Sequence, residues 1–265
     1  MPSLPQMTFR RTTTSARRSS ASVIYDFGMN NGDDVEYYLL KCDRVVGVEA
    51  NASLCEQARE RFAKDIASGR LSILNVALSE RASAAPLTFY IHKTNHVLSQ
   101  LPEPADDVRD EYEPVLVPCR TPSSIIREFG PPLYIKVDIE YYDHHVLREL
   151  FAARIFPPDI SAESHSIGIF ACLVENGYTY FSLVDGQSVS ETYGDATIST
   201  ATGDLPFSFP EHSAGPYGDD IRAPWEDADS FFQTLATAGL GWKDIHASRR
   251  LRSADLAEPI VLAET

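Results

Sequence analysis

The chain has 265 residues and a formal net charge of −15. A chain of this length can bury a core without disulfides, and so acidic a composition argues against nucleic acid and against an anionic membrane as partners. A small neutral or basic substrate, or another protein, stays open. The four cysteines are scattered without zinc-type spacing, which is typical of a reducing compartment, so we expect a cytoplasmic protein.

Residues 1–22 are rich in arginine, serine and threonine and contain no acidic residue. The rest of the chain therefore holds 19 basic and 38 acidic residues, a net charge of −19. No apolar run follows the twin arginine as a secretory signal requires. The composition also allows a transit peptide, but a disordered tail over 1–22 is the simpler expectation. No run approaches the roughly 18 apolar residues of a membrane span. We expect a single domain over 23–248 and a loose tail over 249–265.

The first half of this domain alternates strands and helices. Apolar runs predict strands at 23–25, 45–48 and 71–74, and periodic apolar residues predict helices at 33–41 and 51–68. Right-handed crossovers would make the three strands parallel. This order is the beginning of a doubly wound α/β fold with a mostly parallel sheet.

A polar, glycine-containing loop follows the first strand and has Asp26, Gly28, Asn30 and Gly32 at alternate positions. Glycine lets the backbone approach a ligand closely, and Glu49 at the end of the second strand suits the hydroxyls of a ribose. The loop therefore predicts a nucleotide-type cofactor site. A plain strand, turn and helix without a ligand is the alternative.

The same loop discriminates between two cofactors. A dinucleotide fingerprint has further glycines where this chain has Asn30 and Asp33. Asp33 and Asp34 at the start of the helix would repel a pyrophosphate, whereas S-adenosylmethionine has no phosphate and carries an ammonium and a sulfonium. We therefore expect S-adenosylmethionine rather than NAD.

The chain becomes less regular after the third strand. Residues 86–92 predict a strand that extends the sheet in antiparallel orientation, and 93–113 predict a long loop that is either functional or disordered. A short strand at 115–117 and a helix at 123–129, capped by Thr121, follow.

Carboxylates follow the next apolar strand directly, at Asp138 and Glu140. In an open α/β sheet, ligands bind beyond the carboxyl ends of the strands, so both side chains should face the same crevice as the glycine loop. A further strand at 159–162 brings Glu163 and His165 to this edge. The sequence thus predicts a second polar group opposite the cofactor loop.

The last third begins with a helix from 169 to 177 and a strand at 178–184. Residues 185–223 are rich in Gly, Ser, Thr, Asp and Pro. We interpret them as an irregular insertion near the site or a lid, with disorder as the alternative. A helix at 225–238 and the segment 242–246 close the domain.

Taken together and in order, several motifs resemble the FkbM-type S-adenosylmethionine-dependent methyltransferases. The motifs are residues 26–32, 48–51, 75–78, 135–140 and 177–178. The resemblance implies a class I methyltransferase fold, a Rossmann-like, mostly parallel seven-stranded sheet with helices on both faces. It also implies an activity that most often methylates hydroxyl oxygens of sugars or natural products, with a small-molecule acceptor.

The resemblance also implies roles for residues. Asp26, Gly28 and Asn30 would surround the methionine part of the cofactor, Glu49 would hold the ribose, and Asn75 with Val76 would lie near the adenine. Tyr141 departs from the family, which usually has glycine after the Asp-x-Glu pair. The full set expected to bind the cofactor is Asp26, Gly28, Asn30, Gly32, Glu49, Ala50, Asn75, Val76, Asp138 and Glu140.

Methyl transfer to an alcohol needs an in-line geometry and the removal of a proton. We expect Asp138 or His165 to be the catalytic residue. The alternatives are that Asp138 binds the cofactor's ammonium and that His165 caps the following helix. His96, Tyr141 and Trp225 could line an acceptor pocket, although aromatic residues at such spacings more often belong to the core.

Two further hypotheses stay open. Asp138, Glu140, Glu163 and His165 could hold a divalent metal that lowers the pKa of the acceptor. Alternatively, the chain could be a non-catalytic Rossmann-like protein that binds a partner through its acidic surface and insertion. The joint presence of the cofactor-loop residues and Asp138 favours the enzyme.

Overall fold

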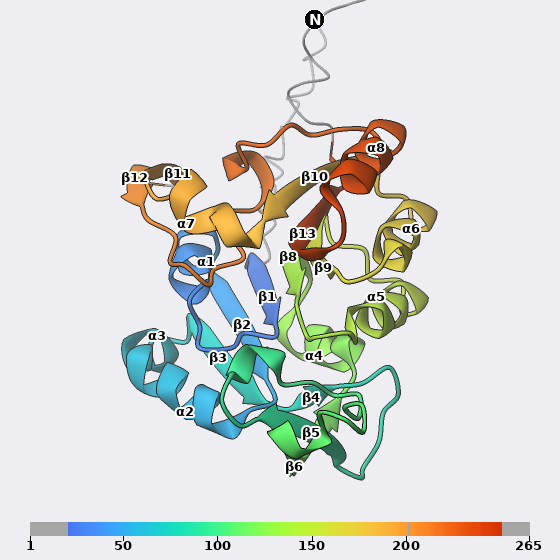
Figure 1. Ribbon diagram of the computed structural model, residues 1–265. Coiled ribbons are helices and arrows are strands. Elements are labelled where there is room, and N and C mark those ends of the chain that lie inside the picture. Colours follow the sequence, from blue (N-terminus) through green and yellow to red (C-terminus); the bar gives the residue numbers. More distant parts are fainter. Residues whose placement is uncertain (1–20, 201, 251–265) are drawn as a thin grey trace, which may run out of the picture.

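The computed structural model describes residues 21–200 and 202–250. A seven-stranded sheet in the order β10-β13-β9-β8-β1-β2-β3 forms its centre (Figure 1). Strand β13 runs antiparallel to both of its neighbours, and the other strand pairs of the sheet are parallel. The chain therefore has the class I methyltransferase fold that the sequence predicted. The strands are β1 (Val23–Phe27), β2 (Arg44–Glu49), β3 (Leu71–Asn75), β8 (Pro132–Val137), β9 (Asp159–Ser164), β10 (Tyr180–Asp185) and β13 (Gly241–Ser248).

Helices cover both faces of this sheet. On one face lie α4 (Pro122–Phe129), α5 (Asp143–Ala152), α6 (Ile167–Glu175) and α8 (Ala228–Ala238). On the other lie α1 (Val35–Lys41), α2 (Ala52–Arg61) and α3 (Ala63–Ala67). Within the described residues, no helix is long and apolar enough to cross a membrane.

Strand β1 shows how the sheet divides its side chains between these faces. Successive side chains of a strand point to opposite sides. Tyr25 and Phe27 accordingly join the core under α4 and α5, and Ile24 joins the core under α1. Asp26, two residues after Ile24, is fully buried on the α1 side. A carboxylate buried this deeply requires a charged or hydrogen-bonding partner.

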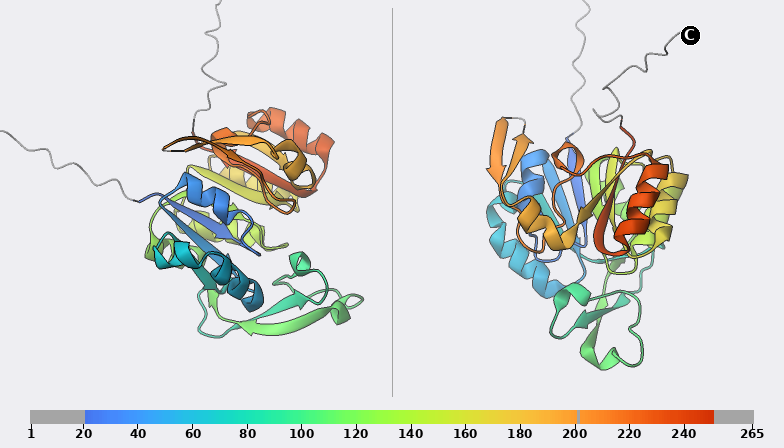
Figure 2. Two further views of the ribbon diagram at one scale, coloured as in Figure 1. Left: turned by 90° about the vertical axis from the view of Figure 1, so that its left-hand side faces the viewer. Right: turned by 45° about the horizontal axis from the view of Figure 1, so that its top comes forward.

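The segment 185–223 contains more regular structure than the sequence predicted. It contains α7 (Val189–Thr192) and the antiparallel pair β11 (Ala196–Thr200) and β12 (Gly203–Phe207), which lies beside α1 (Figures 1 and 2). Several of its apolar side chains are buried against the α1 face of the sheet, among them Val189, Tyr193, Ile198, Phe209 and Tyr217. The insertion therefore forms part of the core on this face.

Two other predictions need correction. The strand predicted at 86–92 is β5 (Leu87–His92), but it pairs with β6 (Tyr112–Val117) in a separate two-stranded sheet instead of extending the central one. Figure 2 shows this pair standing apart from the main layers. The helix predicted at 51–68 divides at Phe62 into α2 and α3. The remaining short elements are β4 (Ala77–Leu78), β7 (Cys119–Arg120) and four 3₁₀ turns, His96–Leu98, Arg109–Glu111, Gly186–Ser188 and Gly218–Asp220.

Candidate active site

The glycine loop after β1 passes close over the end of β8. Gly28 adopts a φ of +87°, and its N–H and that of Met29 both donate to the carbonyl of Val48. A Cβ atom built on Gly28 would lie 1.7 Å from the carbonyl oxygen of Asp138. Only glycine fits this position, because both the backbone conformation and the space exclude a side chain.

The end of β2 is held by hydrogen bonds. The Glu49 carboxylate accepts from the N–H of Asn30 at 3.0 Å and from the N–H of Asn51 at 2.7 Å. Burial raises the pKa of Glu49, and these hydrogen bonds oppose the rise. The Asn75 side chain donates to the carbonyls of Glu49 and Ala50. Asn75 therefore fixes the backbone at the end of β2.

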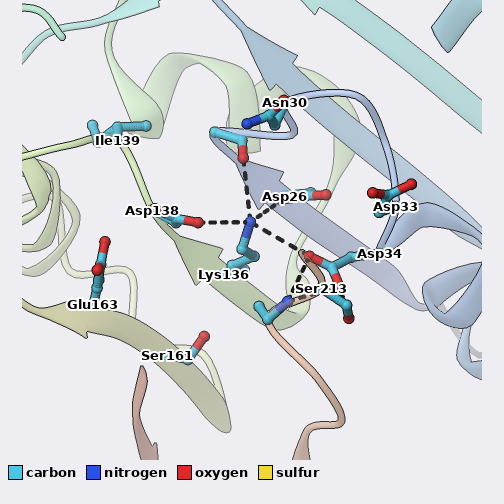
Figure 3. A network of polar contacts seen from close by, with 12 residues as sticks. Asp26, Asn30, Asp33, Asp34, Lys136, Asp138, Ile139, Ser161, Glu163 and Ser213 are labelled. Carbon is cyan, nitrogen blue, oxygen red and sulfur yellow. Dashed lines mark hydrogen bonds and ion pairs between the residues drawn. The ribbon is translucent and has the colours of Figure 1, made fainter. Parts of the chain in front are cut away.

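A buried lysine joins three carboxylates beneath the loop (Figure 3). Lys136 Nζ lies 3.4 Å from Asp26 Oδ1, 3.5 Å from Asp34 Oδ2 and 3.2 Å from Asp138 Oδ2, and it donates to the carbonyl of Gly28 at 3.2 Å. Burial opposes the charge of Lys136, but the attraction of Asp26, Asp138 and Asp34 outweighs it and holds the lysine pKa well above its usual value.

The insertion is attached to this network through Asp34. The Asp34 carboxylate accepts hydrogen bonds from the hydroxyl of Ser213 and the N–H of Ala214 (Figure 3). Asp33 instead forms an ion pair with Arg61 at 2.9 Å. The two acidic residues at the start of α1 are therefore engaged with protein groups, and Asp34 anchors the segment 210–215 beside the lysine.

The opposite side of the crevice gathers acidic groups around His165. Its Nε2 lies 2.9 Å from Glu163 Oε2, 3.7 Å from Glu140 Oε2 and 4.0 Å from Asp143 Oδ2. Burial, with the negative charge of Asp138 as the next cause, raises the pKa of Glu140 to about 8, of Glu163 to about 8 and of Asp143 to about 7. Free carboxylates at this density repel one another.

Tyr141 covers this group from the solvent side. Its ring stacks on that of His165, with centroids 4.6 Å apart, and 64% of the residue is exposed. Glu140 and Tyr141 have φ values of +44° and +63°. The left-handed backbone explains why glycine would suit position 141, since tyrosine adopts this conformation only with strain.

One cavity of about 600 Å³ joins the two sides. Of the residues predicted from the sequence, its wall contains Gly28, Asn30, Glu49, Ala50, Val76, His96, Asp138, Glu140, Tyr141 and His165. Four others lie elsewhere. Asp26 and Asn75 support the wall from behind, Gly32 packs against Phe62, and Trp225 packs against the core on the α1 face.

Sequence reasoning missed several residues of the site. Lys136, His212 and Trp242 line the cavity, and Asp34 and Ser213 hold its base. A lysine inside an otherwise apolar strand was the available signal for Lys136, because a buried ammonium needs carboxylate partners.

The cavity suits a nucleoside cofactor with a charged amino-acid part. Asn30 Oδ1 is buried and makes no hydrogen bond within the described residues, so it can accept one from an ammonium. The Glu49 carboxylate lies in the same wall. Beyond it the wall is apolar and can pack against a flat base, through Leu54, Val76, Ala77, Leu78 and Phe89.

The sheet order and strand directions are those of the class I methyltransferase fold. The chain belongs to the FkbM methyltransferase family, because the model described as "Methyltransferase FkbM domain" matches residues 26–182. No protein with a curated description matches the sequence.

Solved structures are similar to the chain at low identity. The FkbM methyltransferase from Methylobacillus flagellatus KT is 16% identical with a TM-score of 0.34, over 57% of this chain and 35% of that one. The chain thus spans about a third of that protein's length. A SAM-dependent O-methyltransferase from Thermotoga maritima is 9% identical with a TM-score of 0.40, over 87% and 60% of the two chains. An O-methyltransferase from Bacillus cereus, in complex with SAH, is 9% identical with a TM-score of 0.38, over 86% and 74%.

Proposed function

We propose that this protein transfers the methyl group of S-adenosylmethionine to a hydroxyl oxygen of a small molecule such as a sugar or natural product. The observation that carries the proposal is the single cavity wall that includes Glu49 and Asn30 on one side and Asp138 and His165 on the other. Donor and acceptor bound in this cavity would be neighbours, and positioning of this kind supplies much of the rate of a bimolecular transfer.

S-adenosylmethionine supplies an electrophilic methyl group on a sulfonium. On its side of the cavity, Glu49 would accept hydrogen bonds from the ribose hydroxyls and Asn30 Oδ1 one from the ammonium, while Val76 would pack against the adenine. Asn75 acts indirectly, because it holds the carbonyls of Glu49 and Ala50. Asp26 likewise acts through Lys136.

Asp138 is the first candidate for the base that takes the acceptor's proton. Lys136 lies 3.2 Å from one of its oxygens, and the side chain is about one-third exposed in the cavity wall. Lys136 therefore orients the carboxylate while leaving part of it accessible to a substrate. His165 is the second candidate, since its imidazole lies in the same cavity wall and has a nitrogen that can accept a proton.

The acceptor should be neutral or positively charged. Asp138, Glu140 and Glu163 line its side of the cavity and, when ionised, would repel a phosphate or carboxylate. His96 and Tyr141 are in the same wall and would pack against the acceptor. The acidic chain argues against nucleic acid as the substrate and, with its scattered cysteines, is compatible with a cytoplasmic enzyme.

Calorimetry with S-adenosylhomocysteine tests the cofactor half. We expect binding in the micromolar range, and about tenfold weaker binding by Glu49→Gln, the loss of roughly one hydrogen bond to a charged group. Glu36→Gln is the matched control, because Glu36 is exposed and pairs only with Arg61 among the described ion pairs. If S-adenosylhomocysteine does not bind at millimolar concentration, the hypothesis of a non-catalytic binding protein would be favoured over the methyltransferase.

The acceptor half is tested with a panel of hydroxyl-bearing small molecules and S-adenosylmethionine, with methylated product detected by mass spectrometry. We expect Asp138→Asn to reduce turnover at least a hundredfold while S-adenosylhomocysteine binding changes little. Asp106→Asn, an exposed aspartate paired with Arg109, is the control. Full activity of Asp138→Asn would remove Asp138 from the mechanism.

A further inference from the structure

Glu140, Glu163 and His165 bring three potential metal ligands together at the acceptor end of the cavity. One atom from each, a carboxylate oxygen or an imidazole nitrogen, lies within 4.8 Å of the others. They come from two elements, since Glu140 follows β8 and the other two lie at the end of β9. The parallel sheet therefore places them at one edge, as it does for ligand-binding residues in general.

The spacing of these atoms fits a shared ion. Metal bonds of about 2.1 Å at angles of about 90–120° place two ligand atoms about 3.0–3.7 Å apart. His165 Nε2 lies 2.9 Å from Glu163 Oε2 and 3.7 Å from Glu140 Oε2. At 2.9 Å the first pair still lacks hydrogen-bond geometry, because Nε2 makes no hydrogen bond within the described residues. The imidazole thus contacts a carboxylate without donating to it.

A fourth group points independently to a cation. Asp143 is completely buried, and its Oδ2 makes no hydrogen bond within the described residues, although Oδ1 accepts from the N–H of Ile139. Oδ2 lies 4.0 Å from His165 Nε2. A buried carboxylate oxygen without a donor is costly unless a positive charge lies near it.

The protein itself supplies little positive charge here. Lys136, the buried cation of the site, is engaged by Asp26, Asp34 and Asp138. Among the described ion pairs, Glu140, Glu163 and Asp143 share only His165. When ionised, the three carboxyl groups carry more negative charge than one imidazole can offset, and one divalent ion would neutralise it.

We propose that Glu140, Glu163 and His165 bind one divalent first-row transition-metal ion, with Asp143 as a supporting carboxylate. Two carboxylates and an imidazole favour ions such as Mn²⁺, Co²⁺ or Zn²⁺ over Mg²⁺ or Ca²⁺, which prefer ligand sets composed of oxygen alone. Glu140, Glu163 and His165 supply three ligand atoms, so a metal ion with four or more ligands would keep at least one coordination position open to the cavity.

A role of this ion in methyl transfer rests on the proposed function, whereas the binding of the ion to these residues does not. An open coordination position beside Asp138 would accept the hydroxyl oxygen of the acceptor and stabilise negative charge on it. The ion would then share with Asp138 the work of making the hydroxyl nucleophilic, and His165, as a ligand of the ion, would not act as the base.

The test measures metal binding on the full chain after treatment with a chelator. Titration with Mn²⁺, followed by the loss of the free-ion electron paramagnetic resonance signal, should show one site per chain. We expect Glu163→Gln and His165→Gln each to weaken binding at least tenfold. Titration with Co²⁺ should give a visible absorption band that changes in His165→Gln, since the band reports the nitrogen ligand.

Glu80→Gln and His145→Gln are the matched controls. They alter the same residue types in a surface pair whose His145 Nδ1 and Glu80 Oε2 are 3.2 Å apart. Both should bind Mn²⁺ as the unaltered chain does. S-adenosylhomocysteine binding, measured on every variant, reports folding and tests the cofactor half separately. No stoichiometric Mn²⁺ or Co²⁺ binding, or equal affinity in the Glu163→Gln, His165→Gln and control variants, would overturn the metal site without touching the methyltransferase proposal.

Discussion

The two sides of the cavity differ in how their charges are compensated. On the cofactor side, the Glu49 carboxylate receives two backbone N–H groups, and Lys136 lies within 3.5 Å of Asp26 and Asp34 as well as of Asp138 on the acceptor side. On the acceptor side, three carboxylates surround the single imidazole of His165. The protein thus gives the carboxylates of the cofactor side backbone N–H donors and a lysine ammonium, and leaves Asn30 Oδ1 open there, whereas the acceptor side has one imidazole for three carboxyl groups.

This difference indicates where rigidity and variability lie. Buried charges with all their partners in the protein fix a geometry before any ligand arrives. Charged groups without a partner in the protein gain one when the ligand binds, so ligand binding stabilises them more than it stabilises groups that are already paired. We expect substitutions on the cofactor side to cost stability, and substitutions on the acceptor side to cost mainly binding.

Replacement of Lys136 by methionine should have the largest effect. It removes the cation shared by Asp26, Asp34 and Asp138 and leaves these carboxylates buried without it. Breaking a buried pair from one side costs about 3–5 kcal/mol, which urea denaturation would measure. Arg109→Met, in an exposed pair with Glu103, should cost less than about 1 kcal/mol. Similar losses in both variants would show that the lysine network does not stabilise the fold.

Alanine at Gly28 should have the next largest effect. Its Cβ would meet the carbonyl of Asp138, so the loop would have to move and S-adenosylhomocysteine binding should fall at least tenfold. Gly69→Ala is a matched control, because Gly69 also has a positive φ, +77°, but nothing lies within 4 Å of its Cβ position. Calorimetry should show unchanged binding for Gly69→Ala, with a stability cost of about 1 kcal/mol. Equal binding by both variants would contradict the close approach.

Substitutions of Tyr141, on the acceptor side, should have the smallest effect on stability. Tyr141→Gly and Tyr141→Ala both lose the stack on His165, but only glycine relieves the left-handed backbone. We expect Tyr141→Gly to be more stable than Tyr141→Ala by about 1 kcal/mol in thermal unfolding. A more stable alanine variant would mean that the backbone at this position is not strained.

The fold could be predicted because its signals are local and consistent. Apolar runs, helix periodicity and the turn glycines give the order of β1, α1, β2, α2 and β3, and parallel crossovers constrain their arrangement. The partner of β5 could not be predicted in this way. Its pairing with β6 depends on a contact across the intervening loop of residues 93–111, and alternation along β5 does not reveal which edge it joins.

The site shows the same limit. Residues placed directly after parallel strands, such as Asp138 and Glu163, were predicted to reach the crevice because the strand direction determines the edge. Trp242 was missed for the converse reason. It lies at the beginning of β13, and only the antiparallel direction of that strand brings its start to the carboxyl edge. Trp225, chosen as an aromatic candidate, instead packs in the core.

The hydrogen bonds from Ser213 and Ala214 to Asp34 have a consequence for engineering. The segment 185–223 is hydrogen-bonded to the lysine network and contributes buried side chains to one face of the sheet. Deleting it would therefore remove part of the hydrophobic core and part of the site at the same time. The β5–β6 pair stands outside the central sheet, and the loop that joins its strands still brings His96 to the cavity wall. Acceptor preference should therefore be redesigned through the loop of residues 93–111, which leaves the buried Phe89 and Val117 in place.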